Sequence, residues 1–273
     1  MGDVRAAGAM VRMYFQWWRR YPIAMVSSVF NSLYQGVIPG FLFGASFAVG
    51  GRVVGLESSV GTDNLAGYIF LGGVVSGLVA SAFWGVANAL RQEMETGTLE
   101  AAWLTPTRRQ TFVVGYALGG VVLFLFSQVA LFTVGFAFFG LSFRAEILFA
   151  IPAIVVAELA MIGIAYILAA LVLLMREANF FIDTTNFLFS IASGVAFPIT
   201  LLPLIFQPIA LALPTSYAVD ILRHYAIGTR LLFDPVIEYA LLCATTAIAF
   251  PLGRWLFART ESRLRVTGAL AQH

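Results

Sequence analysis

Long apolar runs constrain the fold of this chain more than any other feature. Six windows are almost wholly apolar, and they cover approximately residues 23–49, 65–90, 112–139, 147–175, 181–197 and 236–257. A helix needs about 20 apolar residues to cross a bilayer core about 30 Å thick. Apolar residues make up 60% of the sequence and charged residues only 11%, a balance that ordinary soluble domains do not have. We therefore predict an all-α membrane protein with six transmembrane helices.

The connectors between these windows differ in their arginine content. Twelve of the sixteen Arg residues lie in the N-terminal segment, the second and fourth connectors and the C-terminal tail, whereas four lie in the other connectors. Short loops rich in basic residues stay on the cytoplasmic side of a membrane. The distribution therefore predicts that both termini and segment 91–109 are cytoplasmic. The predicted domains are an interfacial helix over 1–22, a six-span domain over 23–257 and a cytoplasmic tail over 258–273.

The ionisable residue types exclude several function classes. The sequence has no Lys, so it cannot contain the phosphate-binding loop GxxxxGK followed by Ser or Thr. Its single cysteine, Cys243, and its two histidines, His224 and His273, offer neither a disulfide framework nor a metal site. We expect this chain to have no catalytic residue, no metal, no cofactor of its own and no nucleic-acid partner.

The first 22 residues have an amphipathic pattern. Val11 and Phe15 fall on one helical face, and Arg12 and Arg19 fall on the other. A helix of this kind lies along the membrane interface, and Pro22 is suited to turn the chain into the bilayer. The alternative is an extended first span that ends in aromatic belt residues. The residues expected at the interface are Arg12, Trp17, Trp18, Arg19 and Arg20.

Prolines interrupt the apolar stretch between the last two windows. Segment 198–233 contains Pro198, Pro203, Pro208 and Pro214. Proline breaks a helix interior, and irregular backbone at membrane depth needs cover from protein or water. We predict a re-entrant outer hairpin of two short helices, suited to line the exit of a pathway. The alternative is a kinked fifth helix followed by an interfacial helix in which Asp220 and Arg223 form an i, i+3 pair.

Segment 91–109, RQEMETGTLEAAWLTPTRR, is the only dense polar stretch in the first 140 residues. Its pattern predicts a helix end at Gly97, a short transverse helix capped by Thr98, and a helix restart at Pro106. Because both flanking spans are rigid, a push on the short helix would be transmitted into the bilayer. The alternative is a tight turn with ordinary solvated charges. The residues singled out are Arg91, Glu93, Glu95, Gly97, Thr98, Leu99, Glu100, Trp103 and Pro106.

The run EMETGTLEAAWLTPTRR resembles the E-x-E-x-G-T-L-E…TP…R motif of permease subunits of ABC type-2 exporters, in the daunorubicin-resistance-like drug and lipid group. The resemblance extends over the whole chain, and FP…LP…LPTSYAVDILR is similar to the segment that precedes the last span in this family. The matching motif positions are Glu93, Glu95, Gly97, Thr98, Leu99, Glu100, Thr105, Pro106 and Arg109.

The resemblance implies a permease that performs no covalent chemistry. It would pair with a second permease, the same or a different chain, and dock through segment 91–109 onto two copies of an ABC ATP-binding subunit. Those subunits would bind the ATP and Mg²⁺. A hydrophobic or amphipathic drug or lipid would pass between the two permeases. The expected location is the cell (inner or plasma) membrane of a prokaryote, with both termini cytoplasmic.

A few polar residues lie inside the apolar windows. Glu158 lies near the centre of the fourth span, where it is either a pathway residue that contacts a cation or a protonated packing residue. Asp183 and Asn186, one turn apart in the fifth window, fit capping or interhelix contacts better than ligand binding. Small-residue spacings that permit close helix approach occur at Gly36/Gly40/Gly44, Gly73/Gly77 and Gly115/Gly119.

Two other functions remain open from the sequence. One is a polysaccharide- or glycolipid-exporting permease of the same fold, which usually lacks the compact ETGTLE segment and would require a more polar pathway. The other is a non-transporting membrane protein, such as an assembly factor or an ion pathway that uses Glu158. Association with an ATP-binding subunit separates the second from the exporter.

Overall fold

The computed structural model describes residues 60–98, 109–175 and 178–267, together with single residues and short stretches between residues 8 and 53. The described part is mostly helical, and its only strands form a two-residue antiparallel ladder in which β1 (Ala48–Val49) pairs with β2 (Arg52–Val53). An all-helical chain satisfies its backbone hydrogen bonds without help from solvent, as a membrane requires.

The helices follow the apolar windows closely. Three consecutive elements, α5 (Leu65–Ala82), η2 (Phe83–Asn88) and α6 (Ala89–Glu95), form one uninterrupted helix. The others are α8 (Arg109–Phe139), η3 (Ala145–Ala150), α9 (Ile151–Leu174), α10 (Ala178–Ala192), η4 (Ile199–Leu201), α11 (Gln207–Ala212), α12 (Pro214–Ile227) and α13 (Pro235–Thr267).

Four helices of the described residues are long and apolar enough to cross a membrane. They cover Leu65–Glu95, Gln110–Phe139, Ala145–Leu174 and Pro235–Leu264. These four correspond to the second, third, fourth and sixth predicted spans. Most of the predicted first span, 23–49, lies outside the described residues. The six-span count therefore stays a prediction.

Two helix ends differ from the sequence prediction. Helix α10 has 15 residues and ends at Ala192, although the apolar window continues to about residue 197. At 1.5 Å per residue it is about 22 Å long, shorter than the hydrocarbon core of a bilayer. Helix α13 continues to Thr267, ten residues past the predicted end of the last span at residue 257. Charged residues such as Glu261 and Arg263 lengthen it because they are good helix formers outside the bilayer.

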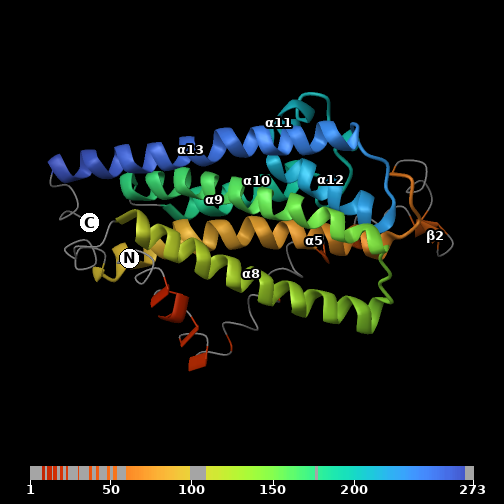
Figure 1. Ribbon diagram of the computed structural model, residues 1–273, viewed down its shortest axis with the longest axis horizontal. Coiled ribbons are helices and arrows are strands. Elements are labelled where there is room, and N and C mark those ends of the chain that lie inside the picture. The colour runs from red at the N-terminus through yellow and green to blue at the C-terminus, as the bar shows by residue number, and fades with distance from the viewer. Residues whose placement is uncertain are drawn as a thin grey trace.

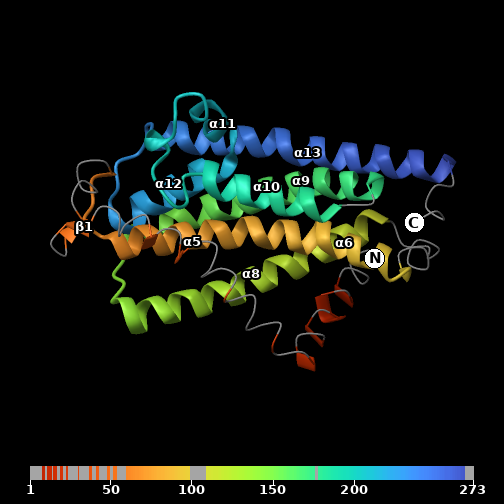
Figure 2. The ribbon, with the colours of Figure 1, turned by 180° about the vertical axis from the view of Figure 1, so that it is seen from behind.

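The helix Leu65–Glu95 occupies the centre of the bundle. In its most apolar part 83% of the residues are buried, against 17% in the corresponding part of α13. Figures 1 and 2 show α8 on one side of α5 and α9 with α12 on the other, with α13 packed lengthwise along the far side of α9. A movement of the central helix therefore reaches most of the described bundle.

Glycines allow two pairs of helices to touch through their backbones. A Cβ on Gly163 of α9 would lie 2.6 Å from the Phe250 Cα of α13, and a Cβ on Gly120 of α8 would lie 2.6 Å from the Ser81 carbonyl oxygen of α5. Small residues at such crossings let membrane helices approach closely. The glycines that make these contacts differ from those singled out by spacing in the sequence, because spacing does not tell which face meets a neighbour.

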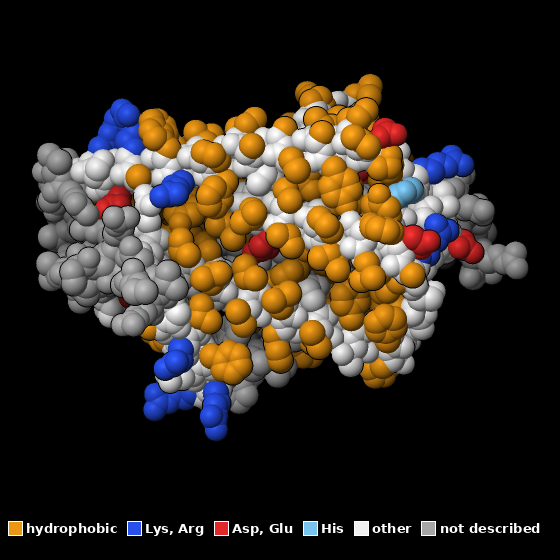
Figure 3. Space-filling view, viewed as in Figure 1, with side chains coloured by type: hydrophobic (Ala, Val, Ile, Leu, Met, Phe, Trp, Pro, Cys, Tyr) orange, Lys and Arg blue, Asp and Glu red, His pale blue; other side chains and the backbone are white. Residues whose placement is uncertain are grey.

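The surface agrees with a membrane-embedded bundle. Figure 3 shows hydrophobic side chains covering the middle of the visible face, whereas most charged side chains gather toward the two ends. The end that carries α6 also holds the start of α8 and the C-terminal part of α13 (Figure 2). There, Arg254 of α13 donates hydrogen bonds of 3.2 and 2.9 Å to the Gln110 side chain of α8. We call this the coupling end, and the opposite end the outer end.

Candidate functional site

The central helix carries a polar cluster at each of its ends. Asn64 caps its first turn, because the Asn64 side-chain oxygen accepts a 2.8 Å hydrogen bond from the Gly67 N–H. From Leu65 to Glu95 the helix has 31 residues and a length of about 46 Å. Six of its residues, Phe83–Asn88, form a π-helical segment. Such segments are frequent at functional sites in helices.

At the coupling end the helix stops where the sequence predicts. Helix α6 ends at Glu95, Thr96 follows as the C-cap, and Gly97 has a φ of +69°. Only glycine adopts this left-handed backbone at little cost. The Thr96 N–H donates to the Gln92 carbonyl at 3.0 Å, and the Gly97 N–H donates to the Met94 carbonyl at 3.1 Å.

The acidic side chains of this turn bind within it. The Arg91 guanidinium donates to both carboxylate oxygens of Glu95, at 2.9 and 3.0 Å, in an exposed i, i+4 pair. The Thr98 hydroxyl donates to the Glu93 carboxylate. These bonds fix the shape of the turn, and they leave the half-buried Glu93 and the exposed Glu95 at the surface. We call residues 91–98 the coupling turn.

The rest of the predicted coupling segment lies outside the described residues, and so does its expected short helix. This applies to Leu99, Glu100, Trp103 and Pro106. Of the predicted interfacial residues, Arg12, Arg19 and Arg20 are exposed and helical, while Trp17 and Trp18 lie outside the described residues. The interfacial helix stays a prediction.

Between α10 and α13 the chain forms short helical pieces, η4, α11 and α12, as the prolines require. Pro198 caps η4, Pro203 lies in the break that follows, Pro208 lies in the first turn of α11, and Pro214 begins α12. In the first turn of a helix proline loses no hydrogen bond. The continuous kinked fifth helix of the alternative interpretation does not form, because α10 ends before Pro198. The re-entrant depth of this segment stays a prediction.

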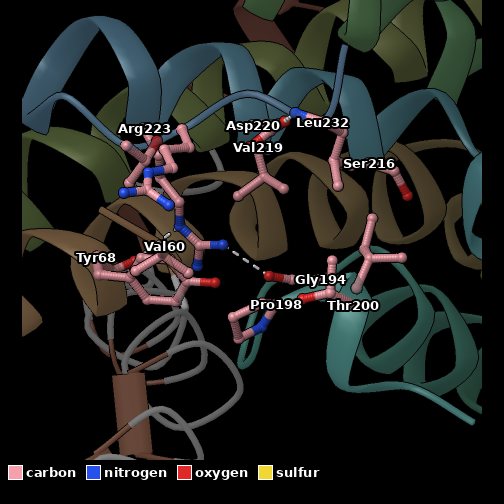
Figure 4. Close-up of a pocket in the computed structure, with 13 residues that line it drawn as sticks. Val60, Tyr68, Gly194, Pro198, Thr200, Ser216, Val219, Asp220, Arg223 and Leu232 are labelled. Atoms are coloured by element: carbon pink, nitrogen blue, oxygen red, sulfur yellow. Dashed lines mark hydrogen bonds between the residues drawn. The ribbon is translucent and has the colours of Figure 1, made fainter. Parts of the chain in front are cut away.

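Arg223 of α12 is the centre of the outer polar cluster. The residue is 3% exposed. Its guanidinium donates to the Tyr68 carbonyl at 3.1 Å, the Gly194 carbonyl at 2.7 Å and the Val195 carbonyl at 2.5 Å. It also lies 3.4 Å from the centroid of the Tyr68 ring, a cation–π contact. Figure 4 shows this guanidinium between Tyr68 and Gly194.

The i, i+3 pair between Asp220 and Arg223 suggested by the sequence is absent among the described residues. The Asp220 carboxylate instead accepts a 2.8 Å hydrogen bond from the Leu232 N–H. Burial raises the pKa of the Asp220 carboxyl, although a hydrogen bond with Glu238, the Leu232 N–H and the charge of Arg223 act in the opposite direction. Arg223 turns away from Asp220 because three carbonyl oxygens and an aromatic ring meet it on the other side.

Sequence reasoning missed two members of the cluster. Glu238, in the first turn of α13, is fully buried, accepts a 3.0 Å hydrogen bond from the Phe233 N–H and lies within hydrogen-bonding reach of the Asp220 carboxyl. Tyr68 is 3% exposed, and in the sequence nothing distinguishes it from the other residues of its apolar window. The only signal available was an acidic residue inside the last predicted span.

A cavity of about 60 Å³ adjoins this cluster. Its lining includes Arg223, Asp220 and the hydroxyl-bearing residues Thr200, Ser216 and Thr229. The Thr229 hydroxyl is buried and has no hydrogen-bond partner among the described residues. The cavity is large enough for a few water molecules or for a side-chain rearrangement.

The three predicted pathway residues lie on two helices, Glu158 on α9 and the other two on α10. Glu158 of α9 is 8% exposed, and one of its carboxylate oxygens lies 3.4 Å from the Ser81 hydroxyl, while the other has no hydrogen-bond partner among the described residues. On α10, Asp183 is exposed and Asn186 is buried, with its backbone carbonyl accepting from Ser190 at 2.9 Å.

Comparisons with known proteins agree with this architecture. Residues 8–226 match the family described as ABC-2 type transporter. The chain is also 26% identical over 253 residues to Nodulation protein J of Rhizobium leguminosarum bv. viciae, covering 90% of this chain and 94% of that protein. The family match takes in the coupling turn, the central helix and Arg223. This chain belongs to the ABC-2 type transporter family.

Proposed function

We propose that this chain is the permease subunit of an ATP-driven exporter whose ATPase is a separate chain. Two copies of the ATP-binding subunit would bind ATP and Mg²⁺ and dock onto the coupling end. A second permease, identical or different, would complete the pathway. The membership in the ABC-2 type transporter family carries this proposal. Both termini would lie in the cytoplasm, and the membrane would be the cell membrane of a prokaryote.

The geometry of the coupling turn supports its role as the docking element. The turn ends a helix of 31 residues that runs through the centre of the bundle. A rigid helix transmits displacement of its end along its whole length. Glu93 and Glu95 give the turn two acidic groups, while Arg91 and Thr98 hold these groups in place. Charged interface residues of this kind set register and partner specificity more than affinity.

The transported molecule in this proposal is hydrophobic or amphipathic, such as a drug or lipid. In the described candidate spans the buried side chains are mostly apolar, and Glu158 and Ser81 form one small polar contact among them. A molecule with a large apolar portion could move along such helices from the inner leaflet, whereas a long sugar chain would need more hydrogen-bonding partners.

The experiment is reconstitution of the permease with its ATP-binding subunit in liposomes. The complex should co-purify, and its ATP turnover should exceed that of the ATP-binding subunit alone. Glu93→Gln with Glu95→Gln keeps hydrogen-bonding oxygens in the turn but removes both charges. We expect this double variant to weaken subunit assembly and to lower ATP-dependent transfer of a fluorescent phospholipid roughly tenfold, the scale of typical coupling energies.

Glu146→Gln is the matched control. It removes an exposed acidic charge in the first turn of η3, at the outer end. Assembly and transport should match the wild type in this control. Intact assembly and transport in the double variant would contradict the docking role of the coupling turn. Absence of any association with an ATP-binding subunit would favour a non-transporting membrane assembly protein.

The alternative substrate class is a polysaccharide or glycolipid. It requires the same fold and the same ATP coupling, so the assembly experiment does not separate it from a drug or lipid. Competition does: a labelled glycolipid and a labelled phospholipid presented together to the reconstituted complex would show which one is transferred. Preferential transfer of the glycolipid would replace the proposed substrate class.

A further inference from the structure

The central helix links the coupling turn to the Arg223 cluster. Glu93 and Tyr68 lie on the same uninterrupted helix, 25 residues and about 38 Å apart. Tyr68 supplies both its carbonyl oxygen and its ring to Arg223. Any tilt of the helix at its coupling end therefore displaces two of the groups that hold Arg223.

Arg223 joins three parts of the chain at the outer end. It belongs to α12, it binds Tyr68 of α5, and it binds the Gly194 and Val195 carbonyls in the turn after α10. This approach depends on Gly72, since a Cβ there would overlap the Val195 carbonyl oxygen and lie 2.8 Å from Nη2 of Arg223. Arg223 thus ties the segment between α10 and α13 to the central helix.

A second partner for Arg223 lies one turn away on the same helix. Asp220 precedes Arg223 by three residues, a spacing at which side chains meet on a helix. Among the described residues its carboxylate accepts one backbone hydrogen bond, from the Leu232 N–H, and the Glu238 carboxyl lies within hydrogen-bonding reach. The cavity of about 60 Å³ adjoins the Asp220 and Arg223 side chains. The guanidinium therefore has two alternative sets of partners. One set is the Tyr68 carbonyl and ring on α5 with the two carbonyls of the turn after α10, and the other is the Asp220 carboxylate on α12.

We propose that Arg223 is a positioning residue of the transport cycle, a latch that exchanges Tyr68, Gly194 and Val195 for Asp220 when the central helix tilts. In the arrangement described, the latch holds the outer segment closed against α5. After the exchange, α12 and the turn separate from α5 and open the exit. The inference rests on the proposed function, because docking of an ATP-binding subunit supplies the tilt.

A disulfide across the latch tests whether α5 and α12 separate. A Cβ on Gly67 lies 2.9 Å from Cγ2 of Ile227, so Gly67→Cys with Ile227→Cys places the two Cβ atoms within disulfide range. Gly67 is next to Tyr68 in α5, and Ile227 follows Arg223 by one turn in α12. Cys243→Ser removes the only natural cysteine and serves as the background. The readout is ATP-dependent transfer of a fluorescent phospholipid in phosphatidylglycerol-containing vesicles.

We expect the oxidised crossing variant to transfer the phospholipid roughly tenfold more slowly than the same protein after reduction, since a closed gate stops release. The control is Ser193→Cys with Thr215→Cys, whose native hydroxyl oxygens lie 2.5 Å apart. This disulfide joins the end of α10 to α12 and leaves α5 free, so oxidation should change transfer less than twofold if the outer segment moves as one unit. Equal transfer before and after oxidation of the crossing variant would overturn the latch.

Asp220→Asn tests the partner exchange without a crosslink. Asparagine keeps an oxygen for the Leu232 N–H but offers no charge to Arg223. We expect transfer per ATP hydrolysed to fall several-fold while assembly with the ATP-binding subunit is retained, because the open arrangement loses its ion pair. Wild-type transfer per ATP in Asp220→Asn would exclude Asp220 as the second partner. Loss of assembly in the background protein itself would instead count against the proposed function.

Discussion

The two polar clusters of the central helix are built in opposite ways. In the coupling turn the hydrogen-bonded partners are at most five positions apart in sequence, and its pairs are exposed or half-buried. The outer cluster brings together Tyr68 and Arg223, 155 residues apart in sequence, and buries both. Water screens the charges of the first cluster, whereas the second is held by hydrogen bonds between buried groups. One end of the helix is therefore suited to be displaced by a partner, and the other end is suited to hold its place.

Arg223→Met should give the largest loss of stability. Methionine has a similar length but no donors, so the Tyr68, Gly194 and Val195 carbonyls lose the hydrogen bonds that they accept from Arg223. We expect the free energy of unfolding to fall by about 3 kcal/mol, because unsatisfied buried polar groups cost about 1–3 kcal/mol each, offset in part by the removal of a buried charge. Denaturant unfolding in detergent micelles measures it. Arg223→Lys should recover only part, since an ammonium cannot reproduce the guanidinium fork. If Arg223→Met lowered the free energy of unfolding by less than Arg91→Ala does, the outer cluster would not depend on its buried hydrogen bonds.

Gly72→Ala should have the next largest effect. The added methyl group meets the Val195 carbonyl and the Arg223 guanidinium, and backbone cannot move aside cheaply. Overpacking of this kind costs about 1–3 kcal/mol. The matched control is Gly97→Ala, where nothing lies within 4 Å and only the positive φ opposes the change. Thermal unfolding of the two variants measures the cost of a steric overlap at Gly72 against the cost of a side chain at the positive φ of Gly97. We expect the larger decrease in melting temperature for Gly72→Ala.

Asp220→Asn should have a smaller effect on stability, and one that depends on pH. Burial raises the pKa of the Asp220 carboxyl in the folded protein, so folding favours its protonated form. The stability from this group is present below the ordinary carboxyl pKa and is lost as pH rises through the folded pKa. The neutral asparagine should therefore unfold at a higher temperature than the wild type at alkaline pH, and the difference should shrink as the buffer becomes acidic. A difference of the opposite sign at alkaline pH would show that Glu238, the Leu232 N–H and Arg223 together outweigh burial.

The contrast between the clusters also explains what could be predicted from the sequence. The helix end at Gly97 depends on a local backbone rule, and the structure confirms it. The interruption of segment 198–233 by its prolines is confirmed in the same way, because the chain there forms short helical pieces. Four apolar windows correspond to helices that are long and apolar enough to cross a membrane, because a long apolar run favours a continuous helix. The partners of Arg223 could not be predicted. An acidic residue three positions away is the partner that a sequence suggests, whereas backbone carbonyls of distant segments leave no sequence signal. Glu238 was missed because hydropathy averages over a single buried acid.

Arg91→Ala should have the smallest effect on the free energy of unfolding. The pair with Glu95 leaves the Arg91 side chain 20% and the Glu95 side chain 58% exposed. Exposed i, i+4 pairs contribute about 0.3–0.5 kcal/mol, and salt screens them. We expect a loss of that size in dilute buffer and almost none in about 1 M salt, where the Debye length falls to about 3 Å. Arg223→Met should lose nearly the same stability in both buffers, because the hydrogen bonds that it removes are buried and their acceptors are neutral carbonyls. If Arg91→Ala lost as much as Arg223→Met, the coupling turn would be a buried structural element, and an ATP-binding subunit could not displace it without unfolding the helix end.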